Sequence, residues 1–163
     1  MKHPLKNIST TLAMTLACAA MPAHADVKIG FLATLSGGGA ALGQDMVDGF
    51  SLAIDERGGK LGGQTIKLLK EDDQLKPDVG VQAVQKLIEK EKVDLVAGVT
   101  FSNVMMAIAK PLADADMTFV GSNAGPAPLA GKQCNKGFFF ASWQNDNQAE
   151  ALGKYAVDKG YKK

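Results

Sequence analysis

Histidine and cysteine are scarce in this sequence, with two of each among 163 residues. His3, His24 and Cys18 all lie within the first 25 residues, a stretch with the features of a secretory leader that is removed on export. The mature chain then has no histidine, and Cys134 is its single cysteine. Histidine-dependent catalytic groups and ordinary zinc or copper sites are therefore excluded. We expect no enzyme activity, no metal and no cofactor, and a Cys134 thiol that is either free or paired outside this chain.

The leader is predicted from three consecutive features. Lys2 and Lys6 precede an apolar stretch over residues 8–21, and the small-residue triplet Ala23-His24-Ala25 follows. This order predicts cleavage after Ala25 and export to the periplasm. The stretch is diluted by hydroxyl residues and is short for a membrane anchor, and the residues before Cys18 match a lipidation signal only in part.

A basic surface is also missing. Without Lys2 and Lys6, 16 basic residues stand against 17 acidic ones, so the mature chain has a formal net charge of −1. Nucleic acid is therefore not an expected partner. The content of 46% hydrophobic and 21% charged residues is typical of a globular protein.

Strand and helix patterns alternate from residue 26 onward. Strands are predicted over residues 27–32, 65–70, 93–99 and 117–121. Helices are predicted over 43–57, from Pro77 onward, from Val104 onward with a kink or early end at Pro111, and over 145–159. The expected buried positions are Met46, Phe50, Ala53 and Ile54 on the first helix and Leu152, Tyr155 and Ala156 on the last. The pattern predicts an α/β fold, a parallel sheet flanked by helices with right-handed crossovers.

Three polar loops follow three of the predicted strands, at residues 36–39, 100–103 and 122–125. In a parallel sheet these loops share one edge, where open α/β sheets bind ligands. Two of them lead into helices, whose free N–H groups suit an anionic ligand group. Taken singly, Ser102 and Asn103 could be helix caps, residues 37–39 could only turn the chain, and Phe101 and Trp143 could belong to the core.

Two other interpretations of the motifs are weaker. A dinucleotide-binding glycine turn fails on spacing, because the third glycine would fall at Leu42. Asp72 and Asp73 are adjacent acids at a strand end, and such pairs are more often solvated loop residues or helix caps than a general acid and base.

Several spaced motifs resemble one family. They are Leu35-Ser36-Gly37 with Gly43-Gln44 and Gly49, Gly58-Gly59 with Leu61-Gly62-Gly63, Asp72-Asp73 with Pro77, and Val93 with Gly98. Residues 26–163 resemble the leucine/isoleucine/valine-binding family of type I periplasmic binding proteins, which serve ABC importers. The resemblance implies a two-lobed receptor with a Rossmann-like lobe that captures a small carboxylate and delivers it to a membrane permease.

The resemblance also implies a set of ligand-binding residues. The ligand's charged groups would be held by Ser102 and by the loop at Asn123, Ala124 and Gly125. The full set of expected ligand-binding residues is Ser36, Leu42, Phe101, Ser102, Asn123, Ala124, Gly125 and Trp143. Gly125 stands where the amino-acid binders have a threonine, and Leu42 where they have an aromatic side chain.

These departures, with the run over residues 122–131, Cys134 and residues 142–146, are similar to family members associated with aromatic acids. We therefore hypothesise a small carboxylate ligand, a branched-chain amino acid or an aromatic acid, with Phe101 or Trp143 against an aromatic ring.

Domain boundaries follow from the same resemblance. Residues 1–25 are the expected leader, residues 26–141 the leading part of the N-terminal lobe, and residues 142–163 the hinge exit and first helix of a second lobe. We expect the chain to be an incomplete receptor that binds its ligand weakly by itself and exposes the apolar patch at residues 138–140. The alternatives are a ligand-sensing domain of the same fold and a fragment of an α/β enzyme whose catalytic residues lie elsewhere.

Overall fold

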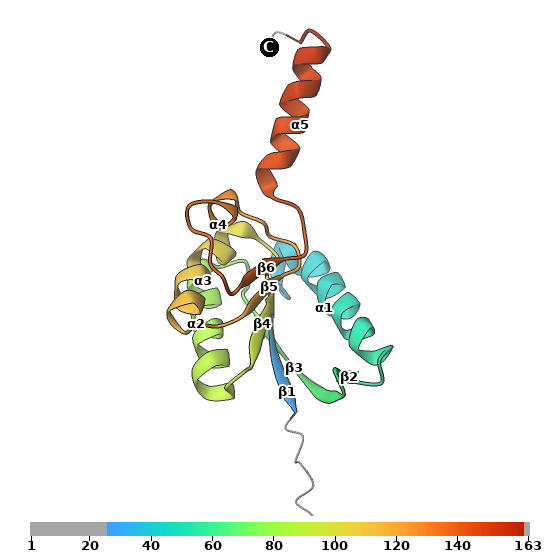
Figure 1. Cartoon of the computed structure of the whole chain (residues 1–163), viewed down its shortest axis with the longest axis vertical. Coiled ribbons are helices and arrows are strands. Elements are labelled where there is room, and N and C mark those ends of the chain that lie inside the picture. Colours follow the sequence, from blue (N-terminus) through green and yellow to red (C-terminus); the bar gives the residue numbers. More distant parts are fainter. Residues whose placement is uncertain (1–25, 162–163) are drawn as a thin grey trace, which may run out of the picture.

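The computed structural model describes residues 26–161. Within this range a single sheet has six strands in the order β2-β3-β1-β4-β5-β6 (Figure 1). The strands are β1 (Val27–Ala33), β2 (Lys60–Leu61), β3 (Gln64–Asp72), β4 (Leu95–Gly98), β5 (Phe119–Gly121) and β6 (Phe138–Phe140). All neighbouring pairs are parallel except β2 and β3. The predicted α/β fold with a mostly parallel sheet is confirmed.

Five α-helices connect or follow these strands within the described range. They are α1 (Ala40–Asp55), α2 (Pro77–Lys86), α3 (Ser102–Asp114), α4 (Ala127–Ala130) and α5 (Asn145–Asp158). A short 3-10 turn, η1 (Gly37–Gly39), precedes α1, and a π-helical segment, η2 (Leu87–Glu91), extends α2. The helix α3 continues through Pro111 to Asp114, so the early end predicted at Pro111 was wrong, and the kink stays a prediction.

The two faces of the sheet are covered differently. The helices α2 and α3 pack on one face over a large core that includes Leu87, Ile108 and Phe119. The other face is covered by α1, where the rings of Phe31 and Phe50 lie 5.0 Å apart. The expectation that Ala53 of α1 is buried was wrong, because the helix turns Val47 toward the sheet and leaves Ala53 exposed.

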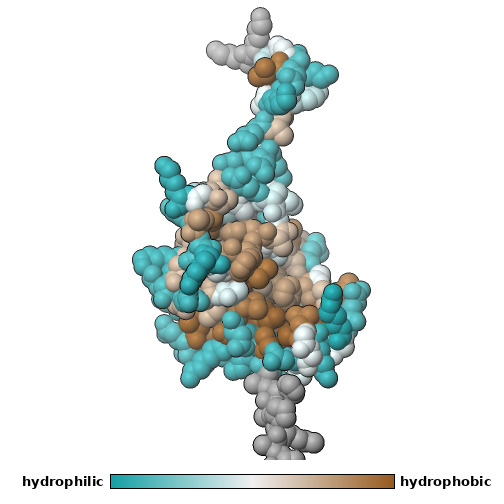
Figure 2. All heavy atoms as spheres, in the orientation of Figure 1, coloured by the Kyte–Doolittle hydropathy of each residue, from teal (hydrophilic) through white to brown (hydrophobic). Residues whose placement is uncertain are grey.

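The strand β6 was not predicted as a strand, because three residues are too few to show a strand period. Phe138 and Phe140 are half-buried and pack edge-on against Phe119, at 5.8 and 6.0 Å between ring centres. Phe139 points to the other face and is 57% exposed. The predicted apolar patch is therefore largely a strand, with one strongly exposed ring. Figure 2 shows hydrophobic residues gathered in the middle of this view of the body, with the projecting helix mostly hydrophilic.

The helix α5 lies apart from the rest of the fold. It points away from the sheet (Figure 1) and has no buried residue. Leu152 and Tyr155 are 68% and 53% exposed, so the expectation that they pack was wrong, and Ala156 is only half-buried. The spacing predicted the helix correctly, but no element of residues 26–161 covers it.

The predicted leader, its cleavage site after Ala25 and the alternative at Cys18 lie outside the described residues. In residues 26–161 no helix has the length and apolar character needed to cross a membrane.

Candidate ligand-binding site

The three predicted ligand loops meet along one edge of the sheet. The parallel register pairs Leu32 with Gly98 and Gly98 with Gly121, so β1, β4 and β5 end side by side. The loops that follow these strands therefore lie next to each other, as the sequence predicted. The end of β3 joins the same edge, because Ala33 pairs with Asp72.

A buried polar network joins these strand ends. Thr34 and Asp73 are fully buried and Thr100 is 1% exposed. The Thr34 hydroxyl donates to Asp73 Oδ1 at 2.5 Å, and the Thr34 amide donates to Thr100 Oγ1 at 3.0 Å. Asp73 Oδ1 also accepts the Leu75 amide at 2.8 Å. Asp73 is thus a buried cross-link between strands, and its interpretation as a solvated residue was wrong.

The first loop is fixed by Asp72. Its Oδ1 accepts the backbone amides of Leu35 and Gln74, each at 2.8 Å. Partial burial would raise the pKa of Asp72, but hydrogen bonds from the Ser36 side chain and from the amides of Gln74, Leu35 and Ser36 outweigh burial and lower it. The role of Ser36 toward a ligand stays a prediction.

The second loop delivers Ser102 at the start of α3. Phe101, the residue before the helix, provides no side-chain cap, and the first turn closes with the Met105 amide donating to the Phe101 carbonyl at 3.1 Å. The amides of Ser102, Asn103 and Val104 precede that bond and have no acceptor within the helix. The Ser102 hydroxyl and these amides form a compact set of donors.

Phe101 shapes the space beside this set. A Cβ atom added at Gly39 would lie 2.6 Å from the Phe101 ring, so the ring rests directly on the glycine turn before α1. This close contact between the first and second loops explains why glycine is needed at position 39. It also leaves the Phe101 ring half-buried at the edge of the sheet.

The third loop contains the other expected ligand residues. Asn123 Nδ2 donates to the Thr100 carbonyl at 2.6 Å, so the amide nitrogen of Asn123 ties this loop to the second one. Ala124 is 4% exposed and Gly125 is buried. A Cβ atom at Gly125 would lie 2.0 Å from the Trp143 carbonyl oxygen. The third loop is therefore in close contact with the second loop at Asn123 and with the backbone of Trp143 at Gly125.

Asn145, the first residue of α5, bridges the second and third loops. Its backbone amide donates to the Gly125 carbonyl at 2.9 Å, and its side-chain Nδ2 donates to Ser102 Oγ at 2.8 Å. Asn145 lies in the run 142–146 but was not among the expected ligand-binding residues, because an asparagine at a helix start is usually only a cap. Thr34 and Thr100 were missed as well, since a threonine at a strand end carries no specific signal.

Cavities at this edge are small. A pocket of about 210 Å³ is lined by Gly125, Pro126, Ala130, Phe140, Ser142, Trp143 and Gln144. Trp143 is one of the residues that line this pocket, and its side chain is 52% exposed. Leu42 lies on α1, is exposed and does not line the pocket. The predicted residues thus line one edge of the described fold, and two of them, Gly125 and Trp143, share a pocket.

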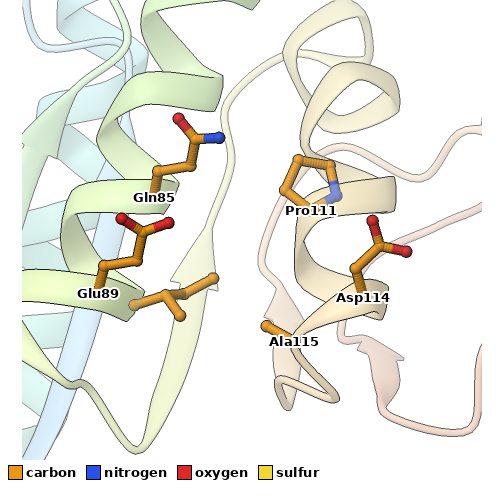
Figure 3. A pocket seen from close by; sticks show the side chains of 6 residues that line it. Gln85, Glu89, Pro111, Asp114 and Ala115 are labelled. Atoms are coloured by element: carbon orange, nitrogen blue, oxygen red, sulfur yellow. The ribbon is translucent and has the colours of Figure 1, made fainter.

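A larger cavity lies at the opposite end of the sheet. It measures about 310 Å³ and is formed by the last turns of α2 with η2 and of α3. Figure 3 shows Gln85 and Glu89 on one side and Pro111 and Asp114 on the other. Helices in a parallel sheet run opposite to the strands, so these helix ends lie away from the ligand loops. None of the expected ligand residues lines it.

No group of three or more potential metal-ligating side chains occurs in the part of the chain that the structure describes. Cys134 is exposed, and its thiol has no disulfide partner within residues 26–161.

Comparison with known proteins identifies relatives of this fold. A Leu/Ile/Val-binding protein from Rhizobium johnstonii is 34% identical over 156 residues, which cover 94% of this chain and 41% of that protein. A solute-binding protein of an ABC transporter from R. palustris, solved in complex with benzoate, matches with a TM-score of 0.79 and 32% identity. That match covers 83% of this chain and 38% of the other.

A branched-chain amino acid transporter substrate-binding protein from Streptococcus pneumoniae, solved in complex with isoleucine, matches with a TM-score of 0.67 and 25% identity. It covers 74% of this chain and 34% of the other. The chain therefore spans less than half the length of these relatives. They are named as binding proteins and not as enzymes. A family model described as periplasmic binding protein matches residues 26–163 and so includes every described residue. The chain belongs to the periplasmic binding protein family.

Proposed function

We propose that this chain supplies one wall of the ligand site of a solute-binding protein of an ABC importer. The ligand is a small carboxylate, either an aromatic acid or a branched-chain amino acid. After capture in the periplasm it is delivered to a membrane permease. The observation that carries this proposal is the start of α3, which has no side-chain cap and where the Ser102 hydroxyl lies beside the first free amides of the helix.

The electrostatics of this point favour a carboxylate. The N-terminus of a helix carries a partial positive charge, and its free N–H groups are aimed at whatever lies in front of it. The mature sequence has no histidine and the described loops contribute no arginine to this edge, so an anion would be held by backbone and hydroxyl donors. The relatives solved with benzoate and with isoleucine support a ligand that carries a carboxylate.

The remaining predicted residues would define the rest of the ligand. Asn123, Ala124 and Gly125 would face its polar groups, and Ser36 and Leu42 would border it from the α1 side. Phe101 or Trp143 would pack against a ring. The relative solved with benzoate favours an aromatic acid as the ligand.

Delivery would require the ligand-bound form to differ from the free form. In the proposed mechanism the crossover at residues 141–144 acts as the hinge between the wall described here and an opposing lobe. A ligand that binds the closed form more tightly shifts the population toward closure, and the closed form is presented to the permease.

The proposal is tested by calorimetric titration of the full-length polypeptide that carries this sequence, with benzoate, 4-hydroxybenzoate and leucine. We expect micromolar or tighter binding of at least one aromatic acid. Tight binding of leucine alone would contradict the aromatic preference, and no binding of any carboxylate would overturn the proposal. Mass spectrometry of the exported protein would test cleavage after Ala25, which predicts Asp26 as the first residue.

A further inference from the structure

Asn145 connects the ligand loops to the crossover through two hydrogen bonds of different kinds. The backbone amide bonds the Gly125 carbonyl at 2.9 Å, and the side-chain Nδ2 bonds Ser102 Oγ at 2.8 Å. The backbone bond is enough to fix the start of α5 against the third loop. The side-chain bond is therefore an additional contact, and it ends on the hydroxyl at the centre of the proposed ligand site.

The direction of the side-chain bond determines where the Ser102 proton can go. A serine hydroxyl has one proton to donate and two lone pairs that accept, whereas Nδ2 of asparagine only donates. Asn145 therefore occupies a lone pair of Ser102 Oγ and leaves the hydroxyl proton available. Among residues 26–161 no acceptor of that proton is found, and the first amides of α3 are also without acceptors in the helix.

We propose that Asn145 is a positioning residue, which orients the Ser102 hydroxyl so that its proton is donated to the carboxylate of the bound ligand. This inference rests on the proposed function and adds a residue that does not contact the ligand itself. Because Asn145 lies at the start of α5, directly after the crossover, the orientation of the Ser102 donor depends on the position of the crossover. Ligand affinity and hinge geometry are thereby linked through one side chain.

The decisive variant is Asn145→Asp in the full-length polypeptide, titrated with benzoate and leucine. The introduced carboxylate has almost the same shape but accepts the Ser102 proton and takes it away from the ligand. We expect affinity at pH 7 to fall by about 30-fold or more, because a hydrogen bond to a charged group is lost and a like charge is added. Asn145→Ala, which keeps the backbone bond, should weaken binding by about 3- to 10-fold.

A pH series distinguishes positioning from a general structural role. As the pH falls toward about 4, the introduced carboxyl takes up a proton and can donate again. The ratio of the variant dissociation constant to the wild-type one should then decrease. Protonation of the ligand and of other groups affects both proteins equally and cancels in this ratio. Asn147→Asp is the matched control, since it adds the same charge at an exposed position of α5 and should change affinity less than threefold at any pH.

Three results would overturn the inference. The first is equal affinity of Asn145→Asp and Asn147→Asp at pH 7, and the second is a ratio that does not change with pH. The third is an undiminished effect of Asn145→Ala in a Ser102→Ala background, where the proposal expects no further loss. If the wild-type protein binds no carboxylate, the proposed function fails, whereas binding that is insensitive to Asn145 removes only this inference.

Discussion

The helices α3 and α5 begin beside each other and differ almost completely in what they bury. Their first residues, Ser102 and Asn145, share a hydrogen bond of 2.8 Å. From there α3 buries Val104, Met105, Ile108, Ala109 and Leu112, while α5 buries no residue. The difference teaches that the sequence of a helix can specify its period without specifying its burial, which depends on whether another element lies opposite.

The interactions that stabilise α5 in residues 26–161 are local. Lys154 pairs with Asp158 at 3.1 Å, and Lys159 lies 5.7 Å from the centre of the Tyr155 ring. Exposed contacts of this kind contribute only tenths of a kcal/mol, up to about 1 kcal/mol each. An isolated helix of this length is marginal in water. The stability of α5 is therefore expected to be independent of the sheet and lower than that of α3.

The largest expected difference comes from matched leucine substitutions. Leu112→Ala removes a fully buried side chain of α3 and should lower the free energy of unfolding by about 2–5 kcal/mol. Leu152→Ala removes a side chain that is 68% exposed and should change it by less than about 0.5 kcal/mol. Urea unfolding of residues 26–163, followed by circular dichroism, measures both. A loss above about 2 kcal/mol for Leu152→Ala would show that α5 is packed in solution.

The next largest effect is expected where the third loop meets the crossover that leads into α5. Gly125→Ala would place a methyl group 2.0 Å from the Trp143 carbonyl oxygen. This distance is too short for a contact, so the crossover must move away from the third loop. We expect a loss of about 1–3 kcal/mol and a changed emission of Trp143, the single tryptophan of the chain. Gly131→Ala is the control, because its added methyl group makes only ordinary contacts. Unchanged Trp143 emission in Gly125→Ala would show that the crossover is not fixed at this contact.

The same contrast explains which features the sequence could predict. The four predicted strands follow from local periodicity. Their parallel direction and the shared edge of the three loops follow from the alternation of strand and helix patterns along the chain. The burial of Asp73 could not be predicted, because it depends on Thr34, which is distant in the chain and meets Asp73 only after β1 and β3 pair. The role of Asn145 was hidden for the same reason, since Ser102 and Gly125 reach it only in the folded chain. The exposure of Leu152 depends on the absence of a neighbouring element within the described residues.

A smaller effect on stability is expected from a change of pH, and it should involve Asp72 at the end of β3 and not α5. Partial burial would raise the pKa of Asp72, but hydrogen bonds from Ser36, Gln74 and Leu35 lower it below the usual 3.8. A lowered folded-state pKa contributes stability above the unfolded-state value and loses it as the pH falls through the folded-state value. Asp72→Asn should therefore destabilise the protein at pH 7 by about 1 kcal/mol at most.

The difference between Asp72→Asn and the wild type should vanish once the pH lies below the lowered pKa of Asp72. Thermal unfolding of both proteins at a series of pH values from 7 downward measures this convergence. A gap that stays constant down to the lowest pH would mean that the effect of the substitution does not come from the charge of Asp72. The Leu152→Ala variant should follow the wild-type pH dependence, because α5 has no buried residue.

The smallest expected effect comes from matched glycine substitutions in α1, which covers the sheet, and in α5, which does not. Gly49 of α1 and Gly153 of α5 are both exposed helix residues, and a methyl group added at either would meet no atom within 4 Å. Alanine at each position should favour the helix by about 0.5 kcal/mol through the lower entropy of the unfolded chain. Gly49→Ala should raise the midpoint of global thermal unfolding, because α1 unfolds together with the sheet it covers. Gly153→Ala should increase helical ellipticity before the transition and leave the midpoint unchanged, because α5 adds no buried surface to the cooperative unit. A shift of the midpoint by both substitutions would show that α5 unfolds together with the sheet. The expectation that α5 is independent of the sheet would then be wrong.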